Sequence, residues 1–144
     1  MKEYNAAFFG VYENLYKVLY NKFGEGEAVE YFRAVMEMGL KKAYDALSFQ
    51  RGNVYDFVRI LEERDNSVGL LVKFPEVKEN RVIYQFYIDP FPGLKGLIPY
   101  HKLDDTYINF KINYLLGSDW HYETTKHLWE GDPYTEFTII KNRM

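Results

Sequence analysis

A predicted β-hairpin at residues 120–141 is the feature that most constrains how this chain folds. The segment reads WHYETTKHLWEGDPYTEFTIIK, in which two alternating runs of residues flank the turn tetrapeptide Glu130-Gly131-Asp132-Pro133. Gly131 can take a positive φ without steric cost, and Pro133 fixes its own φ where the chain must reverse. Two strands joined by so short a loop pair antiparallel. The sequence therefore predicts two neighbouring strands of a sheet at this end of the chain.

Helical periodicity dominates the residues that precede the hairpin. Apolar side chains recur at spacings of three and four residues, which is typical of helices with one buried side. Helices are predicted over residues 4–23, 27–47, 53–64 and 102–116. Asn53 is a typical N-cap residue for the third helix, and Gly117 suits the left-handed position that ends the fourth.

Two shorter runs, residues 68–74 and 81–88, are predicted strands because their side chains alternate and a turn cluster precedes them. Residues 89–99 hold three of the five prolines and are expected to be irregular. The order of elements is ααα-ββ-α-ββ. Short connections make the strands antiparallel. The sequence thus predicts a single α+β domain over residues 1–144, with three N-terminal helices and a four-stranded antiparallel sheet covered on one face by helices.

The first predicted helix carries two apolar stripes. One stripe contains Phe8, Val11, Leu15, Val18 and Leu19. The other contains Phe9, Tyr12, Tyr16 and Tyr20. An apolar arc this wide indicates contact with more than one neighbour. We expect the helix to pack into the core of its own chain, to form a homodimer surface through its tyrosines, or to line a ligand site.

Charge and composition exclude several kinds of partner. The formal net charge is -3, from 18 basic and 21 acidic residues without a long like-charge run, so neither a nucleic acid nor an anionic membrane is expected as a partner. The longest apolar stretch is well below the roughly 18–20 residues of a membrane span. The chain has no cysteine, and its polar N-terminal residues are unlike a signal peptide, so a cytoplasmic protein is expected.

Histidines on the predicted hairpin are the first candidates for chemistry. On one strand face, His121, Glu123 and Thr125 lead to His127, and a tight turn would place His127 opposite Glu136 and Trp129 opposite Tyr134. The His127–Glu136 pair could act in acid–base catalysis, or it could be an ion pair on a solvated sheet face. His121 and His127 are about 20 Å apart by strand rise, too far to share a metal ion, and no metal site is predicted.

A second candidate group precedes the fourth predicted helix. His101 follows the irregular segment and lies close in sequence to Asp104 and Asp105. Neighbouring carboxylates would raise the pKa of a histidine that acts as a base. Alternatively, His101 is a surface residue, and the two aspartates complement the dipole in the first turn of the helix.

Aromatic residues give the remaining signal, since nucleotide-binding loops and hydrolase motifs are missing from the sequence. Aromatic residues make up 19% of the chain. A core rich in them could enclose an apolar pocket, or it could be filled solid. The candidate ligand-binding residues are Tyr84, Phe86, Tyr107, Phe110, Tyr114, Trp120 and Tyr122.

The C-terminal half also resembles a known family. Ile88-Asp89-Pro90, the fourth helix with an aspartate near its start, and the segment TTKHLWEGDP at residues 124–133 followed by Phe137 look like the L-2-amino-thiazoline-4-carboxylic acid hydrolase family. That family is similar in turn to 4-vinyl reductase-type small-molecule-binding domains. The resemblance covers about residues 53–141. It implies an α+β ligand-binding fold that is often dimeric through its helices.

The resemblance does not extend to thiol or haem chemistry. Relatives carry cysteine near the positions of Asp89, His101 and Tyr134 or Thr135, and this chain has none. The related haem-binding domains need an axial histidine on a helix, and no histidine lies within a predicted helix, so no cofactor is expected.

Three functions follow as expectations. The first is a domain that binds or senses a small apolar or aromatic ligand between its helices and sheet. The second is a hydrolase of a small cyclic amide-like substrate, with His101, Asp104, Asp105, His127 and Glu136 as candidate catalytic residues. The third is a structural homodimer.

Overall fold

The computed structural model describes residues 2–143, so Met1 and Met144 of the predicted domain lie outside the described residues. The helices and strands are α1 (Ala6–Phe23), α2 (Glu25–Asp45), α3 (Val54–Ser67), β1 (Val72–Lys78), β2 (Arg81–Phe86), α4 (Tyr100–Leu115), β3 (Trp120–Lys126) and β4 (Thr135–Lys141). Two 3₁₀ turns, η1 (Pro92–Leu94) and η2 (Leu128–Glu130), lie within the connections. The predicted order ααα-ββ-α-ββ and the α+β class are confirmed.

Side-chain caps set where two of the helices begin. The Asn5 side chain accepts a hydrogen bond from the Phe8 amide at 3.0 Å, at the start of α1. The Asn53 side chain accepts hydrogen bonds from the amides of Tyr55 and Asp56 at 2.9 and 3.1 Å, which confirms the predicted cap of α3. Each cap satisfies amides that lack a partner within the helix.

The sheet is antiparallel throughout, with strand order β1-β2-β4-β3. In the central pair, Tyr84 of β2 lies opposite Phe137 of β4, and Val82 lies opposite Ile139. These four side chains are buried on the face that the helices cover. The opposite face carries polar side chains such as Gln85 and Glu136, which hydrogen-bond to each other at 2.8 Å.

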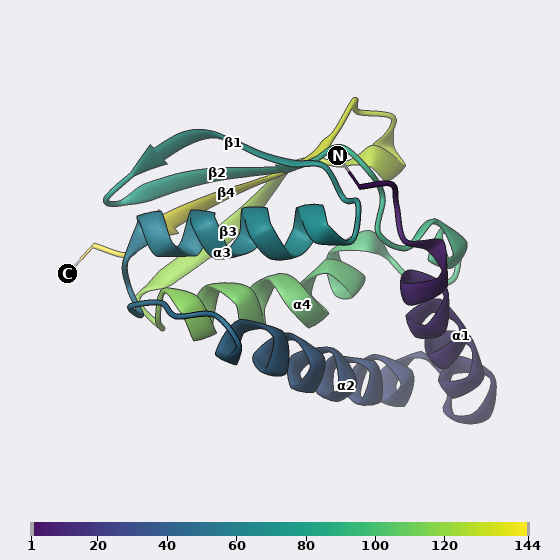
Figure 1. The fold of residues 1–144 in the computed structure, drawn as a ribbon. Coiled ribbons are helices and arrows are strands. Elements are labelled where there is room, and N and C mark those ends of the chain that lie inside the picture. Colours follow the sequence, from purple (N-terminus) through teal and green to yellow (C-terminus); the bar gives the residue numbers. More distant parts are fainter. Residues whose placement is uncertain (1, 144) are drawn as a thin grey trace.

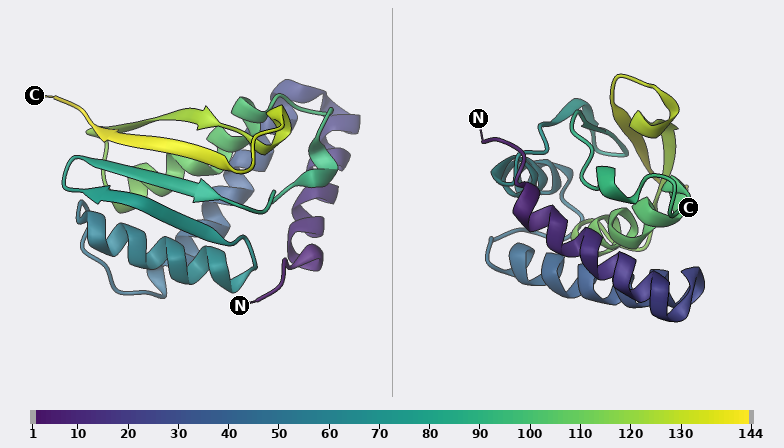
Figure 2. Two further views of the ribbon diagram at one scale, coloured as in Figure 1. Left: turned by 90° about the horizontal axis from the view of Figure 1, so that it is seen from above. Right: turned by 90° about the vertical axis from the view of Figure 1, so that its right-hand side faces the viewer.

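The helices form two levels beneath the sheet (Figures 1 and 2). α3 lies along β1, α4 packs on β3, α2 packs on the far side of α4, and α1 crosses one end against α2 and η1. α4 is therefore enclosed between the sheet and α2. This position explains why residues on several sides of α4 are buried, among them Leu103, Ile108, Lys111 and Ile112.

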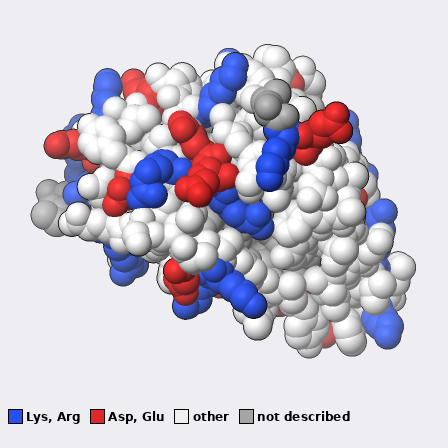
Figure 3. Space-filling model, in the orientation of Figure 1, with Lys and Arg blue, Asp and Glu red and all other residues white. Residues whose placement is uncertain are grey.

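The tyrosine stripe of α1 packs into the core at its middle, whereas Tyr20 near its end is 38% exposed. Phe9 and Tyr16 are buried, and the Tyr16 ring packs edge-on against Phe32 of α2 with a centroid distance of 5.7 Å. Val11 and Val18, on the other predicted stripe, are 68% and 51% exposed. The space-filling view shows few charged side chains on the side where α1 lies, whereas both signs are interspersed over the α3 side (Figure 3). Tyr16 is therefore a core residue, whereas a dimer formed through the stripe stays a prediction.

Several predicted boundaries differ from those of the structure. α3 continues to Ser67, and a turn in which Leu71 takes a positive φ of 51° delays β1 to Val72. α4 begins at Tyr100, so His101 lies within the helix, and Asp104 and Asp105 follow its first turn instead of occupying it. The predicted absence of histidine from helices is therefore wrong, as is the predicted dipole role of the two aspartates.

The hairpin reverses at Gly131 as predicted, with a φ of +89°, but its register near the turn differs. A bulge between Thr124 and Lys126 places Lys126 opposite Glu136, and β3 ends there. The chain then coils into η2, because the His127 amide donates to the Asp132 carboxylate at 2.8 Å. The predicted pairings of Trp129 with Tyr134 and of His127 with Glu136 are therefore wrong.

Replacement of Gly69 by alanine should destabilise the fold more than replacement of Gly96. Both glycines have a positive φ, +83° and +91°, which costs a residue with a Cβ roughly 1–2 kcal/mol. An added Cβ at Gly69 would also collide with the Glu3 carbonyl group, whereas one at Gly96 meets no described atom within 4 Å. Urea denaturation of the two variants checks this, and equal losses of unfolding free energy would contradict the close packing of the N-terminal segment on Gly69.

Candidate functional site

A buried ion pair joins two helices to the sheet. Lys111 of α4 and Asp65 of α3 are each only 3% exposed, and the Lys111 ammonium lies 3.2 and 3.3 Å from the two carboxylate oxygens of Asp65. Lys111 also donates a hydrogen bond to the Tyr84 hydroxyl of β2 at 3.0 Å. Tyr84 in turn donates to Asp65. The three groups thus form a closed polar cluster inside the core.

Aromatic rings surround the same ammonium group. The Lys111 nitrogen lies 5.5, 5.2 and 5.5 Å from the ring centroids of Tyr84, Phe86 and Tyr107. Ring faces attract a cation, and the attraction is stronger where water is excluded. The cation is therefore held by one carboxylate, one hydroxyl and three rings.

Burial changes the protonation balance of this cluster. It lowers the pKa of Lys111, because removal from water penalises the ammonium form, while the charge of Asp65 acts in the opposite direction. Burial likewise raises the pKa of Tyr84 well above its usual range, and the negative charge of Asp65 adds to this effect. The pKa of Tyr44 is raised by the same two causes, and its buried hydroxyl has no hydrogen-bond partner among residues 2–143.

A cavity of about 40 Å³ adjoins the ion pair at the junction of all four helices, β2 and the segment after it. Lys111, Asp65 and Arg64 are the charged residues of its lining. The apolar part of its wall includes Phe9, Met36, Leu40, Phe86, Phe91 and Tyr107. At its outer edge, the half-buried Phe8 ring lies 5.1 Å from the guanidinium carbon of Arg64.

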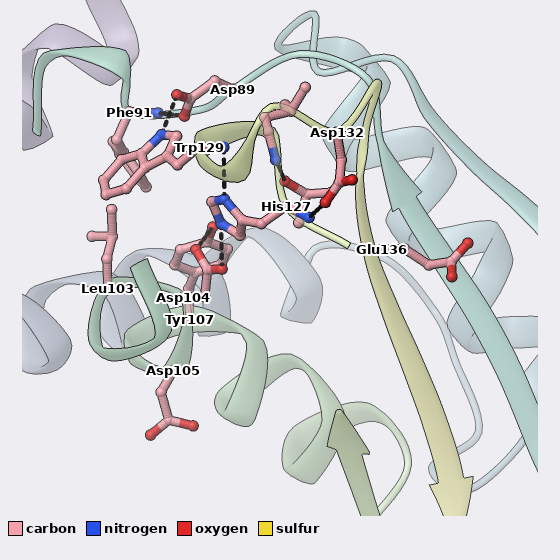
Figure 4. Close-up of polar contacts among 12 residues, drawn as sticks. Asp89, Phe91, Leu103, Asp104, Asp105, Tyr107, His127, Trp129, Asp132 and Glu136 are labelled. Carbon is pink, nitrogen blue, oxygen red and sulfur yellow. Dashed lines mark hydrogen bonds and ion pairs between the residues drawn. The ribbon is translucent and has the colours of Figure 1, made fainter. Parts of the chain in front are cut away.

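A second polar cluster lies at the start of α4 (Figure 4). Phe86 and Tyr107 line both its small cavity and the cavity beside Lys111, and so separate the two. Nε2 of His127 is 2.9 Å from an Asp104 oxygen, and the Tyr107 hydroxyl donates to the other oxygen at 3.0 Å. His127 and Asp104 are 5% and 4% exposed. The structure thus brings together two of the predicted catalytic residues, but it pairs His127 with Asp104 instead of the predicted Glu136.

Both ring nitrogens of His127 already have partners. The Trp129 amide donates to Nδ1 at 3.0 Å, so Nδ1 is an acceptor. We infer that the proton lies on Nε2 and is donated to Asp104, which leaves the ring neutral. Burial raises the pKa of Asp104, and the hydrogen bonds from His127 and Tyr107 oppose that effect.

The surroundings of His127 leave little free space. The Tyr100 ring stacks on the imidazole with a centroid distance of 4.0 Å. The Trp129 indole donates to an Asp89 oxygen at 2.5 Å, and the Phe91 amide donates to the other at 2.9 Å. The cavity among these groups is about 10 Å³, which is close to the smallest space that holds one water molecule.

The other three predicted catalytic residues lie elsewhere. Figure 4 shows Glu136 and Asp105 pointing away from His127. Glu136 binds Gln85 and Thr125 on the open face of the sheet, which is consistent with a solvated polar face. Asp105 pairs with Arg33 at 3.1 Å in an open surface groove that also contains His101. The predicted set of five therefore does not form one site.

The seven predicted ligand-binding aromatics also divide. Tyr84, Phe86 and Tyr107 converge on Lys111. Phe110 and Tyr114 stack on each other in an open groove on another side of α4. On β3, Trp120 is buried, whereas Tyr122 donates to Asp105 at 2.7 Å. Neither β3 residue lines the cavity beside Lys111.

Lys111 and Asp65 were not predicted from the sequence as site residues. Charged residues are rarely buried without a partner, so a lysine and an aspartate are expected at the surface from the sequence alone. One signal was present for Lys111, because it lies four residues after Tyr107 and eight after Leu103, on the apolar stripe of its helix.

Comparisons with known proteins do not assign the chain to a family. No protein-family model matches the sequence, and no curated protein matches it either. Within residues 2–143, no group of three or more His, Asp or Glu side chains is arranged to hold a metal ion. None of the helices described for these residues is both long and apolar enough to cross a membrane.

Replacement of Lys111 by methionine should cost about 3–5 kcal/mol of unfolding free energy, because it leaves the Asp65 charge buried without its partner. The double variant Lys111→Met/Asp65→Asn should recover most of this loss. Chemical denaturation measures both. Lys41→Met, at an exposed ion pair on α2, is the control and should leave the denaturation midpoint nearly unchanged. A Lys111→Met variant as stable as the unmodified protein would contradict the role assigned to the pair.

Proposed function

We propose that this protein binds a small apolar molecule in the cavity beside Lys111, as a sensor, a carrier or an accessory module. The observation that carries the proposal is the cavity itself, which lies between the helices and the sheet and has a mostly apolar wall. Small-molecule sites are commonly concave and apolar, with a few polar groups that fix orientation. The proposal agrees with the resemblance to 4-vinyl reductase-type ligand-binding domains.

The volume of the cavity limits the size of the ligand. At about 40 Å³, it is well below the roughly 150 Å³ cavity known to hold a benzene ring. In this form the site suits a molecule of a few heavy atoms. An aromatic ligand requires the outer side chains Phe8 and Arg64 to move apart.

The polar end of the cavity would orient such a ligand. The Lys111 ammonium has three N–H groups, and its hydrogen-bond partners are Asp65 and Tyr84. Three hydrogen bonds, two to the Asp65 oxygens and one to Tyr84, engage these N–H groups, so an oxygen acceptor on the ligand would take the place of one Asp65 oxygen. The favoured ligand therefore has an apolar body and one carbonyl, hydroxyl or carboxylate oxygen.

The geometry supports binding better than hydrolysis at the His127 cluster. A hydrolase needs room for a substrate and a water molecule, and a base with a free lone pair. The space beside His127 is about 10 Å³, and both of its ring nitrogens are engaged. A homodimer stays a prediction, for which the exposed residues Val11 and Val18 of α1 are available rather than Tyr16.

Methyl NMR with two probes of different size tests the binding proposal. Xenon should shift the Leu40 and Leu70 methyl resonances without any rearrangement, whereas benzene should do so only by displacing Phe8 and Arg64. The variant Met36→Phe fills the cavity and should weaken xenon binding at least about tenfold, a loss of roughly 1.4 kcal/mol. Met38→Phe is the matched control, because Met38 lies on the same helix but is 74% exposed.

The control variant should bind xenon as the unmodified protein does. Failure of both probes to shift the lining methyl resonances would overturn the proposal. Equal binding by Met36→Phe and the unmodified protein would show that the ligand occupies another site.

A further inference from the structure

We propose that Lys111 forms a reversible imine with an aldehyde or ketone that enters the adjoining cavity. This inference rests on the proposed binding function and identifies the chemical class of the ligand. Lys111, Asp65 and Tyr107 all line the cavity, so a carbonyl group bound there lies beside both an amine and a carboxyl group. The inference assigns a covalent role to a lysine that ligand binding alone would not require.

The ion pair provides a route to the neutral amine that an imine needs. Transfer of one proton from the Lys111 ammonium to Asp65, 3.2 Å away, gives a neutral amine beside a neutral carboxylic acid. The transfer changes no net charge. A low-dielectric site favours the neutral pair relative to water, because burial penalises charged forms, and burial lowers the pKa of Lys111 accordingly.

The reaction balances with the groups that are present. The Lys111 nitrogen attacks the carbonyl carbon, and the Asp65 carboxylic acid donates its proton to the carbonyl oxygen to give a carbinolamine. Loss of the hydroxyl group as water, with the proton removed from nitrogen, then gives the C=N bond. One aldehyde or ketone and one amine thus yield one imine and one water molecule. Hydrolysis reverses each step and regenerates the ion pair.

The aromatic cage would stabilise the cationic form of the product. A protonated imine carries its positive charge at the former amine nitrogen. The ring centroids of Tyr84, Phe86 and Tyr107 lie 5.2–5.5 Å from that nitrogen. Desolvated rings stabilise such a cation. Asp65 supplies the counter-charge after its proton is used.

A purely structural role for the buried ion pair explains this arrangement less well than imine formation does. Replacement of a buried ion pair by apolar residues of similar volume is often neutral or stabilising, so stability alone gives weak reason for a lysine at this position. A buried lysine beside a mostly apolar cavity matches the environment in which lysines act as amines toward carbonyl compounds.

Reductive trapping with propanal tests the inference. The protein is incubated at pH 7 with propanal and sodium cyanoborohydride, and the alkylated lysines are identified by peptide mass spectrometry. Lys111 should be the principal modified residue despite its burial, ahead of exposed lysines such as Lys102. Excess propan-1-ol, which has the same length but no carbonyl group, should reduce labelling of Lys111 while leaving Lys102 labelling unchanged.

Two variants complete the test. Lys111→Arg retains a cation but has no reactive amine, and it should lose the label at this position, whereas Lys102→Arg should leave Lys111 labelling intact. Labelling confined to exposed lysines in the unmodified protein would overturn the inference, whether or not Lys111→Arg folds. If, with such labelling, xenon still shifts the methyl resonances of the cavity-lining residues, the binding proposal stands and only the imine proposal is rejected. If it does not, both fail.

Discussion

The ion pair between Lys111 and Asp65 is the interaction on which the rest of the structure depends. It links α4 to α3, and through the Tyr84 hydroxyl it links both helices to the centre of the sheet. Two charges removed from water cost several kcal/mol each unless they are paired with good geometry. The positions of α3 and α4 under the sheet are therefore coupled to one another, because movement of either helix would leave a charge unpaired.

Tyr107 connects this ion pair to the second polar cluster. Its ring lines the cavity beside Lys111, and its hydroxyl holds the Asp104 carboxylate that pairs with His127. Pro90 and Phe91, from the segment anchored by the Trp129 indole through Asp89, belong to the same dividing wall. The His127 cluster thus fixes one wall of the cavity, which gives it a structural role that fits its small free volume.

Much of the fold could be predicted from the sequence, because helical and alternating periods are strong over most elements. The turn at Gly131 was predictable, but the hairpin register was not. His127 and Asp132 hydrogen-bond to backbone amides in the loop and coil it into η2, and such local side-chain competition leaves little periodic signal. The ion pair between Lys111 and Asp65 could not be predicted for a different reason. Lys111 is internal because α4 lies between α2 and the sheet, and Asp65 because the end of α3 packs beside it, and both are properties of tertiary packing. Apolarity selected Phe110 in place of its neighbour Lys111, and Phe110 lies at an open groove.

The most direct test of the account is an NMR titration of the lysine side chains, with the Lys111 resonance assigned from the Lys111→Arg variant. We expect Lys111 to lose its proton at a lower pH than the exposed lysines, because burial lowers its pKa. Propanal should perturb the Lys111 resonance before those of the exposed lysines. A Lys111 resonance that titrates together with those of the exposed lysines and does not respond to propanal would contradict the account.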